Sequence, residues 1–294
     1  MKRLMRKYYG LFFILPWWLG FLIFKLYPFI SSMVYSFFDY NLFRGAVFAS
    51  LGNYIKILSD PLIMKAFSVT FRYALITVPL ELIFALFIAY ILNFQIKGVN
   101  FFRVAYYIPS ILGGSVSIAV LWRFLFKTEG LVNMALSLFS IEPYNWLGRP
   151  EGAFFVIVLL KVWQFGSPMV IFLAALKGVP ADLYEAASID GAGKWRQFFS
   201  ITVPLITPVI FYNFVTQLCH KFQEFNSPYI ITQGGPLRST TLVSLLVYNN
   251  AFKNYEMGMA SAIAWLLFFI IMGFTVVAFM SQKYWVYYSD EEGR

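Results

Sequence analysis

The sequence predicts an all-α membrane protein whose six transmembrane helices form one domain over residues 1–294. Three observations lead to this fold class. Of the residues, 60% are hydrophobic and only 13% are charged, whereas about 25% of the residues in a soluble globular protein are charged. Apolar runs of the length that indicates a membrane span recur along the chain. The basic residues behind the net charge of +9 gather at the ends of these runs.

The first expected span begins after a basic N-terminus and therefore resembles a signal peptide. Its apolar run from Leu11 continues past the roughly 7–15 residues of a signal sequence, and no small-residue cleavage site follows promptly. We therefore expect an uncleaved first span. Each expected span has the ~20 residues that cross the ~30 Å core of a bilayer. In order, the spans cover about residues 11–36, 72–94, 104–126, 153–176, 204–224 and 257–281.

Prolines interrupt the first four spans, at Pro28, Pro79, Pro109 and Pro168. In a membrane bundle such prolines are tolerated, because neighbouring helices and water satisfy the backbone carbonyls that they free. The third span also has a face of small residues, on which another helix can approach closely. These residues are Gly113, Gly114, Ser115 and Ser117.

The orientation follows from the distribution of lysine and arginine, which are enriched in cytoplasmic segments. With the N-terminus inside, the inner segments carry basic residues more densely than the outer ones, although Arg149 and Lys253 lie outside. We expect both termini and the loop 177–203, between spans four and five, to be cytoplasmic.

The sequence of that loop predicts two short helices rather than a simple connection. Pro180 can open the first helix because its missing N–H would be unpaired there, and Asp182 suits the positive end of the helix dipole. Gly191 can end it, since glycine tolerates the left-handed backbone used at helix ends.

The second short helix carries aromatic residues at three- and four-residue spacing, which predicts a shared face. These are Trp195, Phe198 and Phe199. With Ala186 and Ala187 at the contact between the two helices, the loop is expected to form a compact docking element.

The spacing in this loop matches the EAA motif of ABC importer permeases: Glu-Ala-Ala, three residues, Gly, nine residues, Ile, one residue and Leu-Pro. Val203 replaces the usual leucine and keeps an apolar side chain. In this family the loop is the coupling helix, which sits in a cleft of the ATP-hydrolysing subunit. The matching residues are Glu185, Ala186, Ala187, Gly191, Ile201 and Pro204.

The resemblance to carbohydrate-type ABC permeases covers almost the whole chain, in the order typical of the maltose- and glycerol-phosphate-type first permease. Individually short motifs carry it, such as Leu51-Gly52-Asn53-Tyr54, Tyr107-Ile108-Pro109 and Gly234-Gly235-Pro236. It implies a multi-pass protein of the bacterial plasma membrane. It also implies a second, homologous permease as heterodimer partner, two copies of an ABC ATPase, and an extracellular binding protein that delivers a carbohydrate, with an oligosaccharide favoured.

We do not expect this chain to bind nucleotide or to catalyse a reaction itself. Gly191-Ala192-Gly193-Lys194 resembles a phosphate-binding loop, but Ser188 and Trp195 occupy the positions where that motif requires glycine and serine or threonine. One histidine and one cysteine offer neither a metal site nor a nucleophile–base pair. We expect no catalytic residue, no metal and no cofactor, with Mg-ATP bound by partner subunits. No basic stripe predicts nucleic-acid binding.

Polar side chains recur on one face of the fifth span: Gln217, His220, Lys221 and Glu224. Ionisable groups facing lipid cost several kcal/mol, so this face is expected to line a water-filled path and to contact substrate. An interhelical hydrogen-bond network, or a Lys221–Glu224 pair one turn apart, is the alternative.

On the fourth span, Trp163 and Gln164 are further substrate candidates, because aromatic faces stack on sugar rings and amides bind hydroxyl groups. The sequence leaves two possibilities for the charge of the substrate. Lys221 with His220 favours an acidic sugar, since a charge-assisted hydrogen bond is stronger. Neutralisation of Lys221 by Glu224 favours a neutral oligosaccharide.

Two other classes of membrane protein compete with the importer permease. An ion-coupled secondary transporter, with Glu81, Lys161 and Glu224 as relay groups, explains the intramembrane charge but not the EAA motif. A membrane-embedded enzyme lacks a catalytic constellation.

Overall fold

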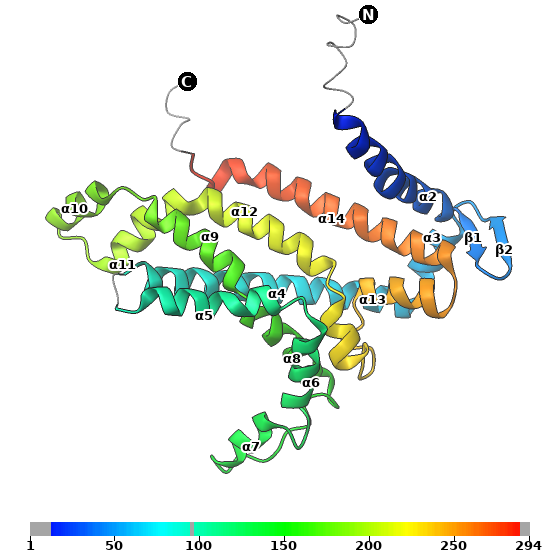
Figure 1. The fold of residues 1–294 in the computed structure, drawn as a ribbon, viewed down its shortest axis with the longest axis horizontal. Coiled ribbons are helices and arrows are strands. Elements are labelled where there is room, and N and C mark those ends of the chain that lie inside the picture. The colour runs from blue at the N-terminus through cyan, green and yellow to red at the C-terminus, as the bar shows by residue number, and fades with distance from the viewer. Residues whose placement is uncertain (1–12, 95–96, 289–294) are drawn as a thin grey trace, which may run out of the picture. The chain divides into compact units, whose positions relative to one another are not determined.

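The computed structural model describes residues 13–94 and 97–288, whose regular structure is helical apart from one β-hairpin (Figure 1). Four short stretches, η1 to η4, are π-helical turns. The elements in order are η1 (Leu22–Leu26), α2 (Tyr27–Tyr35), β1 (Phe38–Asn41), β2 (Gly45–Phe48), α3 (Gly52–Ser59), α4 (Pro61–Asn93), α5 (Val99–Leu112), α6 (Val116–Leu125), α7 (Leu131–Ser137), α8 (Pro150–Trp163), α9 (Gly166–Lys177), α10 (Ala181–Ile189), α11 (Lys194–Gln197), η2 (Phe198–Thr202), α12 (Val203–Phe222), η3 (Pro228–Thr232), α13 (Val243–Tyr248), η4 (Asn249–Lys253) and α14 (Met257–Trp285).

Within the described residues, four helices are long and apolar enough to cross a membrane, and two bent pairs raise the number to six if each pair is one span. The helices are Phe13–Tyr35, Pro61–Asn93, Lys194–Phe222 and Met257–Trp285. The all-α membrane fold is thus confirmed for the described residues. The cytoplasmic placement of both termini stays a prediction, and residues 1–12 and 289–294 lie outside the described part.

The expected third and fourth spans are bent pairs rather than single helices. Between α5 and α6 the chain turns by 101°, and between α8 and α9 by 40°. The first bend falls at Gly113–Gly114 and not at Pro109, which lies within α5. Ser115 begins α6, since its side chain accepts a hydrogen bond from the backbone N–H of Ile118. Residues that start a new helix therefore decided where the span breaks.

The second expected span begins earlier than its hydropathy indicates. Helix α4 starts at Pro61, where a missing N–H costs nothing. The Asp60 carboxylate accepts a hydrogen bond from the backbone N–H of Leu62 over 2.8 Å. Pro79 lies inside α4, which continues past it.

The chain divides into two compact units, Met1–Met64 with Leu246–Phe268 and Lys65–Leu245 with Phe269–Arg294. That the two belong to one transmembrane domain over 1–294 stays a prediction.

In the first unit a buried asparagine holds the β1–β2 hairpin. The strands pair antiparallel, with Phe38 opposite Phe48. Asn53 is only 2% exposed, and its Nδ2 donates to the carbonyl oxygens of Ser36 at 2.9 Å and Phe38 at 2.8 Å. The start of β1 is therefore fastened to α3 by one side chain.

We expect Asn53→Ala to loosen this unit, because two carbonyls lose their donor and each unsatisfied buried group costs about 1–3 kcal/mol. Limited proteolysis of the purified protein in detergent should cleave the variant faster than wild type within residues 37–60. Ile55→Ala is the control, since Ile55 is 66% exposed and should change little. Equal cleavage of Asn53→Ala and wild type would contradict this role.

The second unit has its core between α4, α6, α8 and η3. Its most buried members include Tyr73, Ile157 and Leu242. The Nε1 of Trp122 donates to the carbonyl oxygen of Val156 over 3.2 Å, which joins α6 to α8. This packing joins α6 of the first bent pair to α8 of the second.

Helices α5 and α9 approach each other closely at Gly166. A Cβ there would lie 2.6 Å from the carbonyl oxygen of Tyr106 and 2.8 Å from Oγ of Ser110. Only glycine fits this contact without a backbone shift. The contact holds α5 against α9, which also packs against α12.

Candidate functional site

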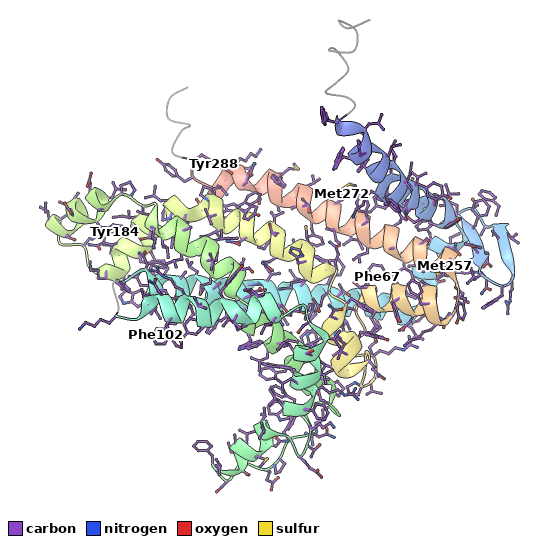
Figure 2. The ribbon with its side chains drawn as sticks, viewed as in Figure 1. Phe67, Phe102, Tyr184, Met257, Met272 and Tyr288 are labelled. Atoms are coloured by element: carbon purple, nitrogen blue, oxygen red, sulfur yellow. The ribbon has the colours of Figure 1, made fainter. Side chains whose placement is uncertain are left out.

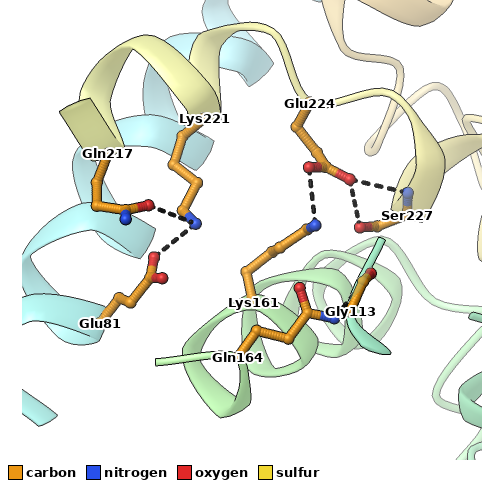
Figure 3. Close-up of polar contacts among 8 residues, drawn as sticks. All are labelled: Glu81, Gly113, Lys161, Gln164, Gln217, Lys221, Glu224 and Ser227. Carbon is orange, nitrogen blue, oxygen red and sulfur yellow. Dashed lines mark hydrogen bonds and ion pairs between the residues drawn. The ribbon is translucent and has the colours of Figure 1, made fainter. Parts of the chain in front are cut away.

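An open, polar cavity of about 530 Å³ lies in the second unit. Residues of α4, α5, α8, α9, α12 and the loop after α12 line it, and Figure 3 draws its polar contacts. The lining residues are Glu81, Ser110, Gly114, Lys161, Gln164, Ser167, Pro168, Gln217, His220, Lys221, Gln223, Glu224, Phe225 and Asn226.

Two ion pairs cross this cavity region. The Nζ of Lys221 on α12 lies 2.5 Å from a carboxylate oxygen of Glu81 on α4, and it also donates to Oε1 of Gln217 over 3.3 Å. The Nζ of Lys161 on α8 lies 2.9 Å from Glu224 (Figure 3). Each lysine is therefore neutralised by a glutamate from a different element.

The alternative prediction of a Lys221–Glu224 pair is wrong. Helix α12 ends at Phe222, so Glu224 lies beyond the helix and no longer follows its one-turn spacing. Its carboxylate instead accepts hydrogen bonds from the backbone N–H of Ser227 at 3.0 Å and from the Ser227 hydroxyl at 2.6 Å. This turn directs Glu224 toward Lys161.

The structure brings together all four polar residues expected on the fifth span, since each lines the cavity. Gln164 of the fourth span lines it too, at the bend between α8 and α9. Its Nε2 donates to the carbonyl oxygen of Gly113 over 3.2 Å. Trp163 does not line the cavity and packs against Trp122, with ring centroids 5.3 Å apart.

Several cavity residues were missed or read differently from the sequence. Glu81 and Lys161 were singled out as relay groups of the rival ion-coupled transporter. Ser110 and Ser167 were not singled out, although each adjoins a proline in a span, and helix interruptions are where membrane proteins expose polar groups. Asn226 was not singled out either; it lies in the loop after α12, which is a further interruption of the helix.

The cavity can bind a polar, hydroxylated ligand. It combines amide, hydroxyl and paired charged groups with an aromatic side chain, Phe225, and an apolar one, Pro168. A mixture of apolar surface with a few convergent polar groups is typical of small-molecule sites. Among residues 13–94 and 97–288, no group of three or more His, Cys, Asp and Glu could hold a metal ion.

The loop with the EAA motif forms an exposed element in the same unit. Helix α10 lies beyond the ends of α9 and α12 (Figure 1), and Figure 2 labels Tyr184 within it. The Glu185 side chain is exposed, and within the described residues no hydrogen bond or ion pair engages it. Ile189 and Trp195 are 87% and 73% exposed. Apolar side chains this exposed indicate a contact surface.

Gly191 ends α10 as its position predicts. Its φ is +75°, and its N–H donates to the carbonyl oxygen of Ser188 over 3.1 Å. The next N–H, of Ala192, donates to the carbonyl oxygen of Ala187 over 2.9 Å. This pair of bonds is the Schellman motif, which requires a left-handed residue.

The second half of the loop differs from expectation, because it is not a separate helix. Residues Lys194–Phe222 form one helix that includes α11, η2 and α12. Ile201 lies in the π-helical turn η2, and Pro204 follows at the start of α12. Proline offers no N–H to the helix ladder, and π-turns accommodate such gaps.

Polar side chains join α10 to this helix. The hydroxyl groups of Tyr184 and Thr202 share a hydrogen bond of 2.7 Å, and Nε2 of Gln197 donates to Oγ of Ser188 over 2.9 Å. Ala186 is exposed.

The three aromatic residues expected on one face of this helix contact one another: the ring centroid of Phe199 lies 5.1 Å from that of Phe198 and 6.3 Å from that of Trp195. Phe198 packs against Tyr90 of α4, with ring centroids 4.7 Å apart. Trp195 and Phe199 stack on each other and remain exposed.

A bundle of membrane spans around a polar cavity, with an exposed helix at one end, is typical of a membrane transport subunit. The chain belongs to the family described as the binding-protein-dependent transport system inner membrane component, which it matches over residues 65–286. It is therefore a multi-pass inner-membrane component of a transport system.

Relatives match over most of their length. The probable ABC transporter permease protein YesP of Bacillus subtilis is 43% identical over 96% of this chain and 93% of its own. The trehalose/maltose transport system permease protein MalF of Thermococcus litoralis is 35% identical over 91% of each chain. The multiple sugar-binding transport system permease protein MsmF of Streptococcus mutans is 33% identical over 92% of this chain and 93% of its own.

Among solved structures, the fold is similar to that of a bacterial ABC transporter involved in the import of the acidic polysaccharide alginate. The TM-score is 0.83 at 20% identity, over 96% of this chain and 98% of the other. At this identity the likeness concerns the fold alone.

Proposed function

We propose that this chain forms half of the translocation pathway of an ATP-driven importer for a carbohydrate, with an oligosaccharide as the favoured substrate. The polar cavity between α4, α8 and α12 carries the proposal, because its amides, hydroxyls and paired charges suit sugar hydroxyl groups. Relatives named for trehalose and maltose, multiple sugars and lactose support the substrate class.

The proposed substrate contacts are Gln164, Gln217 and His220, with Lys161 and Glu224 beside them. Carboxylate and ammonium groups both bond to hydroxyls, since a hydroxyl donates one hydrogen bond and accepts others. Lys221 is 7% exposed in its side chain and is held by Glu81 and Gln217, so its proposed role is structural.

Coupling to ATP hydrolysis is assigned in this proposal to α10 and the helix after it. The exposed Glu185, Ile189 and Trp195 supply a charged and apolar surface for a cleft of the ATPase subunit. Two ATPase copies would bind Mg-ATP, and this chain would hydrolyse none. Closure of the ATPase dimer would move α10, and the spans would then reopen outward.

The remaining partners in the proposal are a second, homologous permease and a substrate-binding protein outside the membrane. The family description supports the binding protein. A further solved relative in fold is the alginate transporter in complex with an alginate pentasaccharide-bound periplasmic protein. The first helix, Phe13–Tyr35, has no buried residue, which leaves its surface available to the second permease or to lipid.

An ion-coupled secondary transporter remains the rival function, because two lysine–glutamate pairs lie in the cavity region. The ion pairs disfavour it, since each carboxylate is already neutralised by a lysine 2.5 Å or 2.9 Å away. The exposed surface of α10 would also have no use in a transporter without an ATPase.

Co-purification and reconstitution test the proposal. We expect the tagged chain, isolated from its native host, to carry an ATPase and a second permease. In proteoliposomes, saccharide uptake should require ATP and the binding protein. Proton-driven transport by the chain alone would establish the rival function instead.

A further inference from the structure

The charged groups of the cavity balance, and this balance has a consequence for substrate choice. Two lysines and two glutamates line it, on α4, α8, α12 and the loop after α12. His220 is the remaining titratable group of the lining. Both lysines are paired, so the described part of the cavity offers no cation free to meet an anionic ligand.

The two pairs differ in accessibility. The side chains of Lys221 and Glu81 are 7% and 3% exposed, whereas those of Lys161 and Glu224 are both 12% exposed. Lys221 also has Gln217 as a second partner, but Glu224 is the one ion-pair partner that the structure gives Lys161. Lys161 is therefore the cation whose availability depends on a single carboxylate.

We propose that Glu224 sets the charge preference of the cavity: by neutralising Lys161 it makes the cavity select uncharged saccharides over acidic ones. The inference rests on the proposed function, since it takes the cavity to be where a saccharide binds. A saccharide carboxylate would have to compete with Glu224 for Lys161, whereas a hydroxyl can bond to either side chain without separating them.

A change of Glu224 to glutamine isolates the charge. Glutamine keeps an Oε1 acceptor for the backbone N–H and hydroxyl of Ser227, which fix residue 224 at 3.0 and 2.6 Å. Its amide group carries no charge, so the ammonium of Lys161 loses its counter-ion and faces the cavity. The opposite change, Lys161→Gln, leaves Glu224 as an unpaired anion.

Binding to the assembled transporter in nanodiscs tests this inference. The complex holds this chain, its partner permease and the ATPase, without the binding protein, so the binding protein's own specificity does not enter. Equilibrium dialysis measures the neutral probes maltotriose and lactose and the acidic probe trigalacturonate. The readout is the ratio of the dissociation constants for the neutral and acidic probes.

We expect wild type to favour the neutral probes. Glu224→Gln should shift the ratio about tenfold toward trigalacturonate, because hydrogen bonds to an unpaired charge are stronger than those between neutral groups. Lys161→Gln should shift the ratio the other way. The double variant Lys161→Gln/Glu224→Gln restores electrical balance and should return close to the wild-type ratio.

Each contrary result has a distinct meaning. An unchanged ratio in Glu224→Gln, a wild-type preference for trigalacturonate, or a shift that persists in the double variant would overturn the charge role of Glu224 while leaving the importer intact. Absence of saccharide binding by wild type would overturn the proposed function itself, and this inference with it. If Glu224→Gln does not fold, the Lys161→Gln shift decides alone.

Discussion

Gly191→Pro should reduce saccharide uptake to background while the protein still inserts into the membrane at the normal level. Gly191 has a φ of +75°, and the proline ring holds φ near −65°. Proline also removes the N–H that bonds to the Ser188 carbonyl. Both changes destroy the left-handed end of α10 and redirect the surface that we assign to ATPase contact. The measurements are uptake of labelled substrate and ATPase activity of the purified complex.

Gly191→Asn is the matched control for this loss. Asparagine keeps the N–H and tolerates a left-handed backbone, and a Cβ at position 191 would meet nothing within 4 Å. We therefore expect Gly191→Asn to transport nearly as well as wild type, with Gly191→Ala between the two. If Gly191→Pro transports normally, the end of α10 does not matter for coupling and the assignment fails.

The second large effect is on stability and concerns the deepest ion pair. Lys221→Met leaves the Glu81 carboxylate, whose side chain is 3% exposed, without its counter-charge. Removing one partner of a buried pair typically costs about 3–5 kcal/mol. We expect the melting temperature of the complex in detergent to fall on the order of 10 °C. Glu81→Leu alone should be destabilising for the same reason.

The double variant Lys221→Met/Glu81→Leu separates the charge effect from lost packing. Replacing both members of a buried pair by apolar residues of similar size is often neutral or stabilising. The double variant should therefore regain most of the melting temperature that either single variant loses. A Lys221→Met protein as stable as wild type, or a double variant no better than the single ones, would show that the pair does not stabilise this cavity.

The polar face of the fifth span shows how far helical spacing can be followed. Gln217 and Lys221 are four residues apart, and their side chains share the hydrogen bond that such spacing allows. The same reasoning extended to Glu224 chose the wrong partner, since α12 had already ended at Phe222. Residues three and four apart share a face only while the helix continues.

Trp163 and Gln164 make the same point from the fourth span. The two residues are adjacent in sequence and were both expected to meet substrate, but only Gln164 lines the cavity. Adjacent helical residues point about 100° apart, because the helix has 3.6 residues per turn. The Trp163 side chain packs against Trp122 of α6, so the Gln164 side chain is the one that faces the cavity.

The sequence by itself determined the membrane class of the protein, the approximate positions of its spans and the left-handed end of α10 at Gly191. These features depend on residues within a few positions of one another: apolar run length sets a span, and one glycine satisfies a helix end. Only the tertiary structure decided the pairing of Lys221 with Glu81 and of Lys161 with Glu224, and the cavity that these pairs line. These partners lie far apart along the chain, and which of several opposite charges a buried lysine reaches depends on how the helices pack.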